Sequence, residues 1–229
     1  MLTKPQPEAT RSRSGPARRT RRGGPPQPLT RAGIVAAALD LVDRDGLKAL
    51  SMRRLGAALG VDPMAVYHHL PNKEALLDAI VEAVMAKIDL TADDPAASPE
   101  DRIMAAARAY RDAMLAHRNA LPIVLVRGPV TQVALAPVEL LLGVLRAAGL
   151  PPGEALAGMN AIAAAVRGVV GMAAFAAERC HAQELERSMA DLPAGAFPRL
   201  REALGCGGDR LERDFEFGVR ALARGLIGA

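Results

Sequence analysis

The chain has 229 residues, of which 50% are apolar and 3% aromatic. This apolar fraction can bury a sizeable core, and few runs of β-branched residues reach strand length, so composition favours an all-α protein. Cys180 and Cys206 stand in no metal-ligand spacing, so two reduced thiols in a cytoplasmic protein are expected. The most apolar stretch, residues 161–177, is interrupted by Arg167 and is too short for a bilayer, so no membrane partner is expected.

The first 28 residues carry the formal excess of positive charge. They hold seven basic residues and one acidic residue, a net charge of +6, whereas the rest of the chain holds 22 basic and 24 acidic residues, a net charge of −2. With six Pro and few apolar residues, residues 1–28 are predicted to be a disordered basic tail. Two interpretations stay open: an arm that contacts DNA phosphates or the minor groove, and a solvated extension with no such role.

A first helix is predicted from Thr30 to Asp45. Thr30 is suited to cap its N-terminus, and Gly46 is suited to end it. Apolar residues recur between them with the period of one buried helix face, namely Ile34, Ala38, Leu41 and Val42.

Two short helices joined by a tight turn are predicted next, over residues 51–59 and 63–69. Ser51 can cap the first helix, and Gly60 fits the left-handed position that ends it. Asp62 can cap the second helix, and Pro63 suits its first position. So short a turn forces a steep crossing, the geometry of a helix-turn-helix whose second helix enters the major groove. The buried faces are expected to contain Leu55, Ala58 and Leu59 in the first helix, and Val66 and Leu70 in the second.

The outward face of the second short helix carries unusual groups for a merely solvated surface, which would normally present Lys and Glu. It holds Met64, Ala65, Tyr67, His68 and His69. A longer helix capped by Asn72 is predicted to follow and to end near Asp89, with Lys73 at its start facing solvent or a phosphate. We interpret the outward face as a contact surface, with an exposed His pair of no function as the alternative.

These elements resemble a known family. From Thr30 to about Asp89 the chain is similar to the DNA-binding domain of the tetracycline-repressor (TetR) family, most specifically in YHHLPNKEALLDAI. GVLRAAGLPPGEALAGMNAI and DFEFGVRALARGL resemble ligand-binding and dimerisation helices of the branch that contains the tetracycline repressor. The resemblance implies a tail over 1–28, a three-helix helix-turn-helix domain over 29–90, and an all-α ligand-binding and dimerisation domain over 91–229.

The expected DNA contacts follow from residue type and from the resemblance. Arg53 offers paired donors that match guanine, with Arg54 as the less favoured neighbour, and Met64 can touch thymine methyl groups. The resemblance assigns phosphate contacts to Tyr67, His69 and Lys73. The full set of expected contacts is Ser51, Arg53, Pro63, Met64, Ala65, Tyr67, His68, His69 and Lys73.

Helices are expected in the C-terminal half at about 99–119, 121–126, 130–148, 152–179 and 208–227. The last carries Leu211, Phe215, Val219, Leu222 and Leu226 at heptad-like spacing, and helix 152–179 is rich in small residues. The resemblance makes these two helices, doubled by symmetry, a four-helix bundle in a homodimer. A core within one subunit is the alternative for either helix.

An effector pocket is expected among these helices. Its candidate lining residues are Met104, Tyr110, Met114, His117, Val124, Arg127, Leu141, Asn160, Met172 and Phe175. The resemblance places Val124 and Met172 where the tetracycline repressor binds its magnesium complex, and neither side chain serves a hard cation. We therefore expect no metal or other cofactor, and a small, largely apolar effector other than magnesium-tetracycline.

The sequence thus predicts a ligand-responsive transcriptional regulator, a repressor released by its effector from a palindromic double-stranded DNA operator in the cytoplasm, at the nucleoid. An activator or a ligand-independent repressor of the same fold is the alternative, and a helical adaptor that binds no DNA is less favoured. An enzyme is not expected, because no nucleophile motif, Gly-rich phosphate loop or metal spacing is present.

Overall fold

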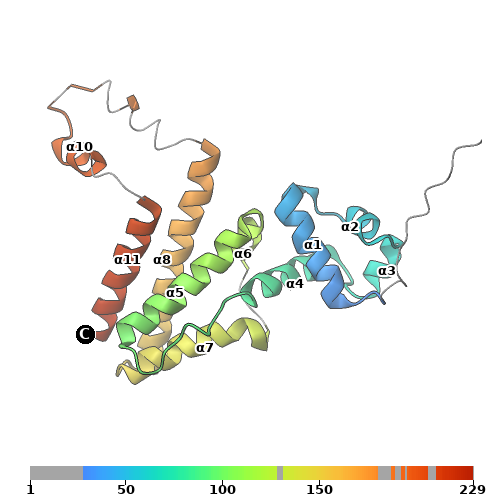
Figure 1. Ribbon diagram of the computed structural model, residues 1–229, viewed down its shortest axis with the longest axis horizontal. Coiled ribbons are helices and arrows are strands. Elements are labelled where there is room, and N and C mark those ends of the chain that lie inside the picture. The colour runs from blue at the N-terminus through green and yellow to red at the C-terminus, as the bar shows by residue number, and fades with distance from the viewer. Residues whose placement is uncertain are drawn as a thin grey trace, which may run out of the picture.

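The computed structural model describes residues 28–127, 131–179, 187–188, 192–193, 195–205 and 210–228. Within these residues it contains helices and no strand, which confirms the all-α prediction. Figure 1 shows two groups of helices, α1 to α4 on one side and α5, α7, α8 and α11 on the other. The predicted tail up to residue 27 lies outside the described residues, as do Cys180 and Cys206.

The first group begins with α1 (Arg31–Asp45), which matches its predicted bounds. The Oγ1 of Thr30 accepts a hydrogen bond from the N–H of Gly33 at 3.1 Å. A 3-10 turn, η1 (Leu47–Ala49), leads to α2 (Met52–Leu59), α3 (Pro63–Tyr67) and α4 (Lys73–Met85). All four predicted core residues of α1 are buried, which confirms its inner face: Ile34, Ala38, Leu41 and Val42.

Helix α4 ends at Met85, four residues before the predicted end at Asp89. Beyond the end of the helix, the Asp89 carboxylate accepts hydrogen bonds from the Thr91 N–H at 2.9 Å and from the Thr91 hydroxyl at 2.6 Å. These local bonds compete with the helical pattern, as Asp side chains often do. The same bonds keep the pKa of Asp89 below its usual range.

The second group consists of α5 (Pro99–Ala116), α7 (Gln132–Ala147), α8 (Pro152–Arg179) and α11 (Arg210–Ile227). Three smaller elements accompany them: η2 (Arg118–Ala120), α6 (Leu121–Val124) and α10 (Pro198–Gly205). Helix α5 stops before the predicted Asn119 because His117 leaves the helical conformation, with φ −121° and ψ 46°. Helix α8 has its predicted bounds and packs against α5, α7 and α11.

By length and composition alone, α8 could cross a membrane, since its segment Pro152–Ala174 has a mean hydropathy of 1.5. The expectation that the apolar stretch is too short to cross a bilayer is therefore wrong for α8 as a whole. The fold gives the apolarity another role, because Ala155, Ile162 and Val166 are buried among the neighbouring helices. A core helix passes the same test of length and hydropathy.

Helix α11 turns part of its apolar series towards the core of its own chain. Phe215 and Val219 are buried, and Leu211, Leu222 and Leu226 are partly buried. A Cβ at Gly158 of α8 would lie 2.9 Å from the Cδ2 of Leu226, so the two helices approach closely here. Phe215 and Val219 therefore belong to the intramolecular core, whereas the other three keep part of their surface exposed, and the dimer bundle of α8 and α11 stays a prediction.

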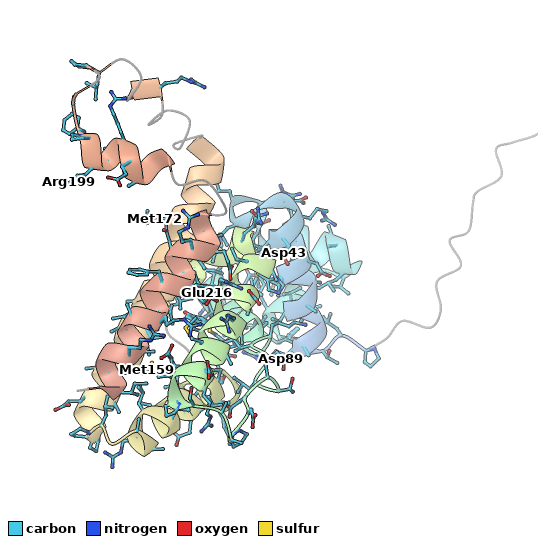
Figure 2. The ribbon with its side chains drawn as sticks, turned by 60° about the vertical axis from the view of Figure 1, so that its left-hand side comes forward. Asp43, Asp89, Met159, Met172, Arg199 and Glu216 are labelled. Atoms are coloured by element: carbon cyan, nitrogen blue, oxygen red, sulfur yellow. The ribbon has the colours of Figure 1, made fainter. Side chains whose placement is uncertain are left out.

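Ion pairs hold α11 against α5. Arg108 contacts Glu216 at 2.7 Å, and Glu100 pairs with Arg220 at 2.7 Å and Arg224 at 2.9 Å. Figure 2 shows Glu216 on the side of α11 that faces α5. The guanidinium of Arg111 also lies 4.3 Å from the ring centre of Phe215. These contacts fix α11 along the length of α5.

Candidate nucleic-acid interface and cavity

Helices α2 and α3 form the predicted helix-turn-helix. The Oγ of Ser51 accepts a hydrogen bond from the N–H of Arg54 at 3.2 Å, which caps α2. Gly60 ends α2 in the left-handed conformation, with φ 70° and ψ 26°. Asp62 then caps α3 by accepting from the Met64 N–H at 2.8 Å. Each capping residue of the motif thus does what its type and position predicted.

The close approach of α2 and α3 depends on Gly56, which the sequence reasoning missed. A Cβ there would lie 3.0 Å from the carbonyl oxygen of Val61 and 3.2 Å from the backbone nitrogen of Pro63. Gly56 is buried, whereas Ala58, which was expected on the buried face of α2, is exposed. The prediction for Ala58 is therefore wrong. A Gly inside a helical pattern was the signal that could have found Gly56.

The outward face of α3 is exposed as predicted. Met64 has 63% and Tyr67 has 40% of its surface exposed, whereas Val66 and Leu70 point into the core at 0% and 1%. His68 and His69 are also exposed, and Pro63 and Ala65 are partly buried. An aromatic ring, two imidazoles and a thioether are therefore available to a partner at one short helix.

Two neighbouring arginines differ in what they already contact. Arg54 is tied to the C-terminal end of α1 by an ion pair with Asp45 at 2.7 Å. Arg53 is exposed and has no bonded partner in the part of the chain that the structure describes. The free guanidinium supports the sequence preference for Arg53 over Arg54 as a reader of DNA.

The N-terminal end of α4 offers a second cationic position. Asn72 caps the helix by accepting from the Ala75 N–H at 2.8 Å, and the ammonium-bearing Lys73 is exposed in the first turn. A helix N-terminus with a Lys is suited to a phosphate. DNA contact by each of the predicted residues stays a prediction, with their exposure as its support.

A cavity of about 290 Å³ lies in the second group of helices. Residues of α5, α7 and α8 line it, together with Met85 at the end of α4 and Ile88 just beyond. Its walls are mostly aliphatic, and Tyr110, Asn160 and Arg167 supply polar groups. The Nε of Arg167 donates a hydrogen bond to the hydroxyl of Tyr110 at 2.7 Å.

The structure brings only part of the predicted pocket set together. Tyr110, Leu141 and Asn160 line the cavity. Met172 does not, because it lies on the outer side of α8 with 73% of its surface exposed. The remaining members that lie elsewhere in the fold are Met104, Met114 and Val124 in the core, and His117 and Arg127 at contacts with the first group. The side chain of Phe175 lies outside the described part.

Arg167 is the one charged residue among the described cavity lining, and the set predicted from the sequence does not contain it. It was noted only as a charge that interrupts an apolar stretch. That interruption was itself a signal, because a charged residue within a buried apolar helix usually has a specific partner or function. Met159 and Pro137 were also missed, and nothing in their local sequence distinguishes them from other core residues.

Polar contacts join the two groups of helices at α1 and α4. His117 Nδ1 lies 2.8 Å from Asp43 Oδ2, and the side-chain amide of Asn119 donates to the carbonyl of Asp43 at 2.8 Å. The guanidinium of Arg127 bonds Glu74 and Asp78 of α4. These carboxylates raise the pKa of Arg127 further above its usual range. His117 and Arg127, which the sequence assigned to a pocket, thus hold the helix-turn-helix part in place.

Helix α4 connects the exposed face with the cavity. It begins at Lys73, beside the helix-turn-helix, and its last residue, Met85, lines the cavity. A helix of 13 residues spans roughly 20 Å. A change at the cavity can therefore reach the helix-turn-helix through one rigid element.

Comparison with known proteins agrees with this architecture. Residues 34–80 match the family model "Bacterial regulatory proteins, tetR family", and residues 92–227 match "Tetracyclin repressor-like, C-terminal domain". An HTH-type transcriptional regulator of Saccharopolyspora erythraea is 31% identical over 207 residues, 86% of this chain and 84% of the relative. The class A tetracycline repressor of Escherichia coli is 41% identical over 88 residues, 38% of this chain and 40% of the repressor.

Solved structures show the same fold. Apo ActR from Streptomyces coelicolor superposes with a TM-score of 0.79 at 29% identity, covering 88% of this chain and 96% of ActR. ActR solved in complex with actinorhodin gives a TM-score of 0.77 at 28% identity, covering 88% of this chain and 98% of ActR. With both of its domains matched, this chain belongs to the TetR family of bacterial regulatory proteins.

Proposed function

We propose that the protein is a transcriptional repressor that leaves its operator when a small molecule occupies the cavity. The observation that carries this proposal is the position of α4, whose first residue stands beside the helix-turn-helix and whose last residue, Met85, lines the cavity. The repressor among its relatives and the ligand complex of ActR support the same function.

The coupling follows from linkage between two binding equilibria. A ligand that displaces Met85 favours a different position of α4, and α4 is bonded to Arg127 through Glu74 and Asp78. If that position no longer lets the α3 helices fit successive major grooves, DNA and ligand weaken each other's binding. A typical coupling of about 1 to 3 kcal/mol lowers operator affinity roughly 5- to 150-fold.

Two copies of the chain are part of the proposal. A single motif of this size binds DNA weakly, whereas two copies read two half-sites about one helical turn apart. The outer sides of α8 and α11 expose Met172 and Phe217, the latter with 77% of its surface exposed. Small residues such as Ala161, Ala164 and Ala221 are exposed on the same helices and permit close packing. We assign the dimer contact to this outer face.

On the DNA, Arg53 is assigned to a base edge, and Tyr67, His69 and Lys73 are assigned to phosphates. The protein is expected to act in the cytoplasm, at the nucleoid. Residues 29–90 would bind DNA, and residues 91–229 would bind the effector and the second subunit.

The test is a selection of bound duplexes from a random pool with the purified full-length protein, together with its mass in solution. A palindromic consensus and a dimer are expected, and the Arg53→Ala variant should lose the consensus. A monomer that prefers no duplex contradicts the proposal. A map of bound sites relative to promoters then separates a repressor from an activator.

A further inference from the structure

The cavity contains one fixed charge among its described lining residues. That charge is the guanidinium of Arg167, and every other lining residue of the described chain is uncharged at neutral pH. Burying a cation beside aliphatic walls is unfavourable unless an opposite charge or several acceptors accompany it. Arg167 is partly buried and lies in this setting.

Arg167 is also incompletely bonded. Its Nε donates to the Tyr110 hydroxyl at 2.7 Å, and its guanidinium carbon lies 5.9 Å from the centre of that ring. Among the described residues no carboxylate pairs with it, although Arg102, Arg108 and Arg127 each have carboxylate partners. A guanidinium has five N–H donors, so most of those of Arg167 remain for a ligand.

The neighbouring polar groups complete an acceptor-binding set. The Tyr110 oxygen accepts from Arg167, which leaves the phenolic proton free to be donated to a ligand. Asn160, an exposed residue that lines the same cavity, carries an amide that can donate as well. All three groups can donate hydrogen bonds, and the guanidinium matches a planar carboxylate with two parallel bonds.

We propose that the effector is a small carboxylic acid with an apolar body, whose carboxylate binds Arg167 and Tyr110 while the body fills the aliphatic part of the cavity. This inference rests on the proposed function of the cavity as the effector site. It sharpens the sequence expectation of a largely apolar ligand by adding one negative charge. A purely structural Arg167–Tyr110 bond is the competing explanation.

The test compares acids with neutral molecules of the same shape. Calorimetric titration of the DNA-free, full-length protein uses 2-naphthoate with 2-naphthamide, cinnamate with cinnamamide, and octanoate with octanamide. At least one acid is expected to bind about 10- to 100-fold more tightly than its amide, the range of a hydrogen-bonded charge. Equal affinity within every pair overturns the proposal, as does the absence of acid binding up to roughly 1 mM.

Variants locate the effect. Arg167→Met should abolish the preference for the acid, and Tyr110→Phe should weaken acid binding several-fold with little change for the amide. Arg199→Met, at an exposed Arg on α10, is the matched control and should behave as wild type. Unchanged preference in Arg167→Met overturns the proposal. If that variant does not fold, Tyr110→Phe and the wild-type acid–amide comparison still decide.

Operator binding separates this inference from the proposed function. Gel shifts at fixed salt are run with the same acid–amide pairs. Acid binding without operator release would contradict the release mechanism and leave the carboxylate site standing. Operator release by the amides as readily as by the acids would support the repressor and overturn the carboxylate site.

Discussion

The helix-turn-helix and the cavity differ in how their parts are held together. Caps at Ser51 and Asp62 and the turn at Gly60 act between residues at most a few positions apart. The cavity instead joins α4, α5, α7 and α8, and its Arg167–Tyr110 bond spans 57 positions. Local chemistry therefore specifies the DNA-facing motif, whereas the cavity exists only once distant helices have packed.

The largest expected effect concerns the helix-turn-helix, where neighbouring residues make the contacts. Gly56→Val places a branched side chain against the Val61 carbonyl and Pro63, where even a Cβ would have to displace backbone. Overpacking of this kind costs typically 1–3 kcal/mol, and a displaced α3 should also reduce specific operator binding by more than roughly 100-fold. Thermal unfolding and gel shift measure the two effects. Ala58→Val, at an exposed position of the same helix, is the control, and equal behaviour of the two variants would contradict the role of Gly56.

The next effect concerns the exposed guanidinium. Arg53→Ala should weaken specific binding by about 1–3 kcal/mol and relax preference at one base pair. Arg54→Ala should change base preference little, because Arg54 already pairs with Asp45. Affinities for the selected operator and for single-base variants, at one salt concentration, compare the two. Greater loss of base preference in Arg54→Ala would reverse the assignment.

A smaller effect is expected where the two regions meet. Arg127→Gln removes the charge that binds Glu74 and Asp78 of α4. The coupling between ligand and operator should change by about 0.5–2 kcal/mol while ligand affinity without DNA stays near wild type. Operator affinity with and without ligand measures the coupling. Arg118→Gln, at an exposed Arg of η2, is the control, and unchanged coupling in Arg127→Gln would remove this contact from the mechanism.

The smallest effect concerns pH and the attachment of α11. Hydrogen bonds from Arg224 and then Arg220 lower the pKa of Glu100 below its usual value of 4.5. A carboxyl whose pKa is lower in the folded state stabilises the fold above its unfolded pKa, and that stabilisation is lost as pH falls through the folded pKa. Melting temperatures from pH 7 to pH 3 should therefore fall less steeply in Glu100→Gln than in wild type. Equal falls in melting temperature for the two proteins between pH 7 and pH 3 would contradict the contribution of Glu100. Glu154→Gln, at an exposed position, is the control.

Much of the fold could be predicted from neighbouring residues. The cap at Thr30, the turn at Gly60 and the bounds of α8 follow from residue type and periodicity, and the structure confirms them. Other predictions failed where distant partners decide, as at His117 and Arg127, which contact α1 and α4 instead of lining the cavity. The apolar series of α11 has the spacing of an interface and of a core alike, and only packing against neighbouring helices showed that Phe215 and Val219 belong to the core.

The sequence by itself determined the helices, their caps and the exposed face of α3, because those depend on a few adjacent residues and on which positions repeat. Tertiary structure alone decided that His117 contacts Asp43, 74 positions away, and that Arg224 contacts Glu100, 124 positions away. It also decided that Arg167, a charge within an apolar stretch of sequence, lines a cavity. Periodicity tells which side of a helix is buried, but the identity of the group opposite depends on how separate helices come together.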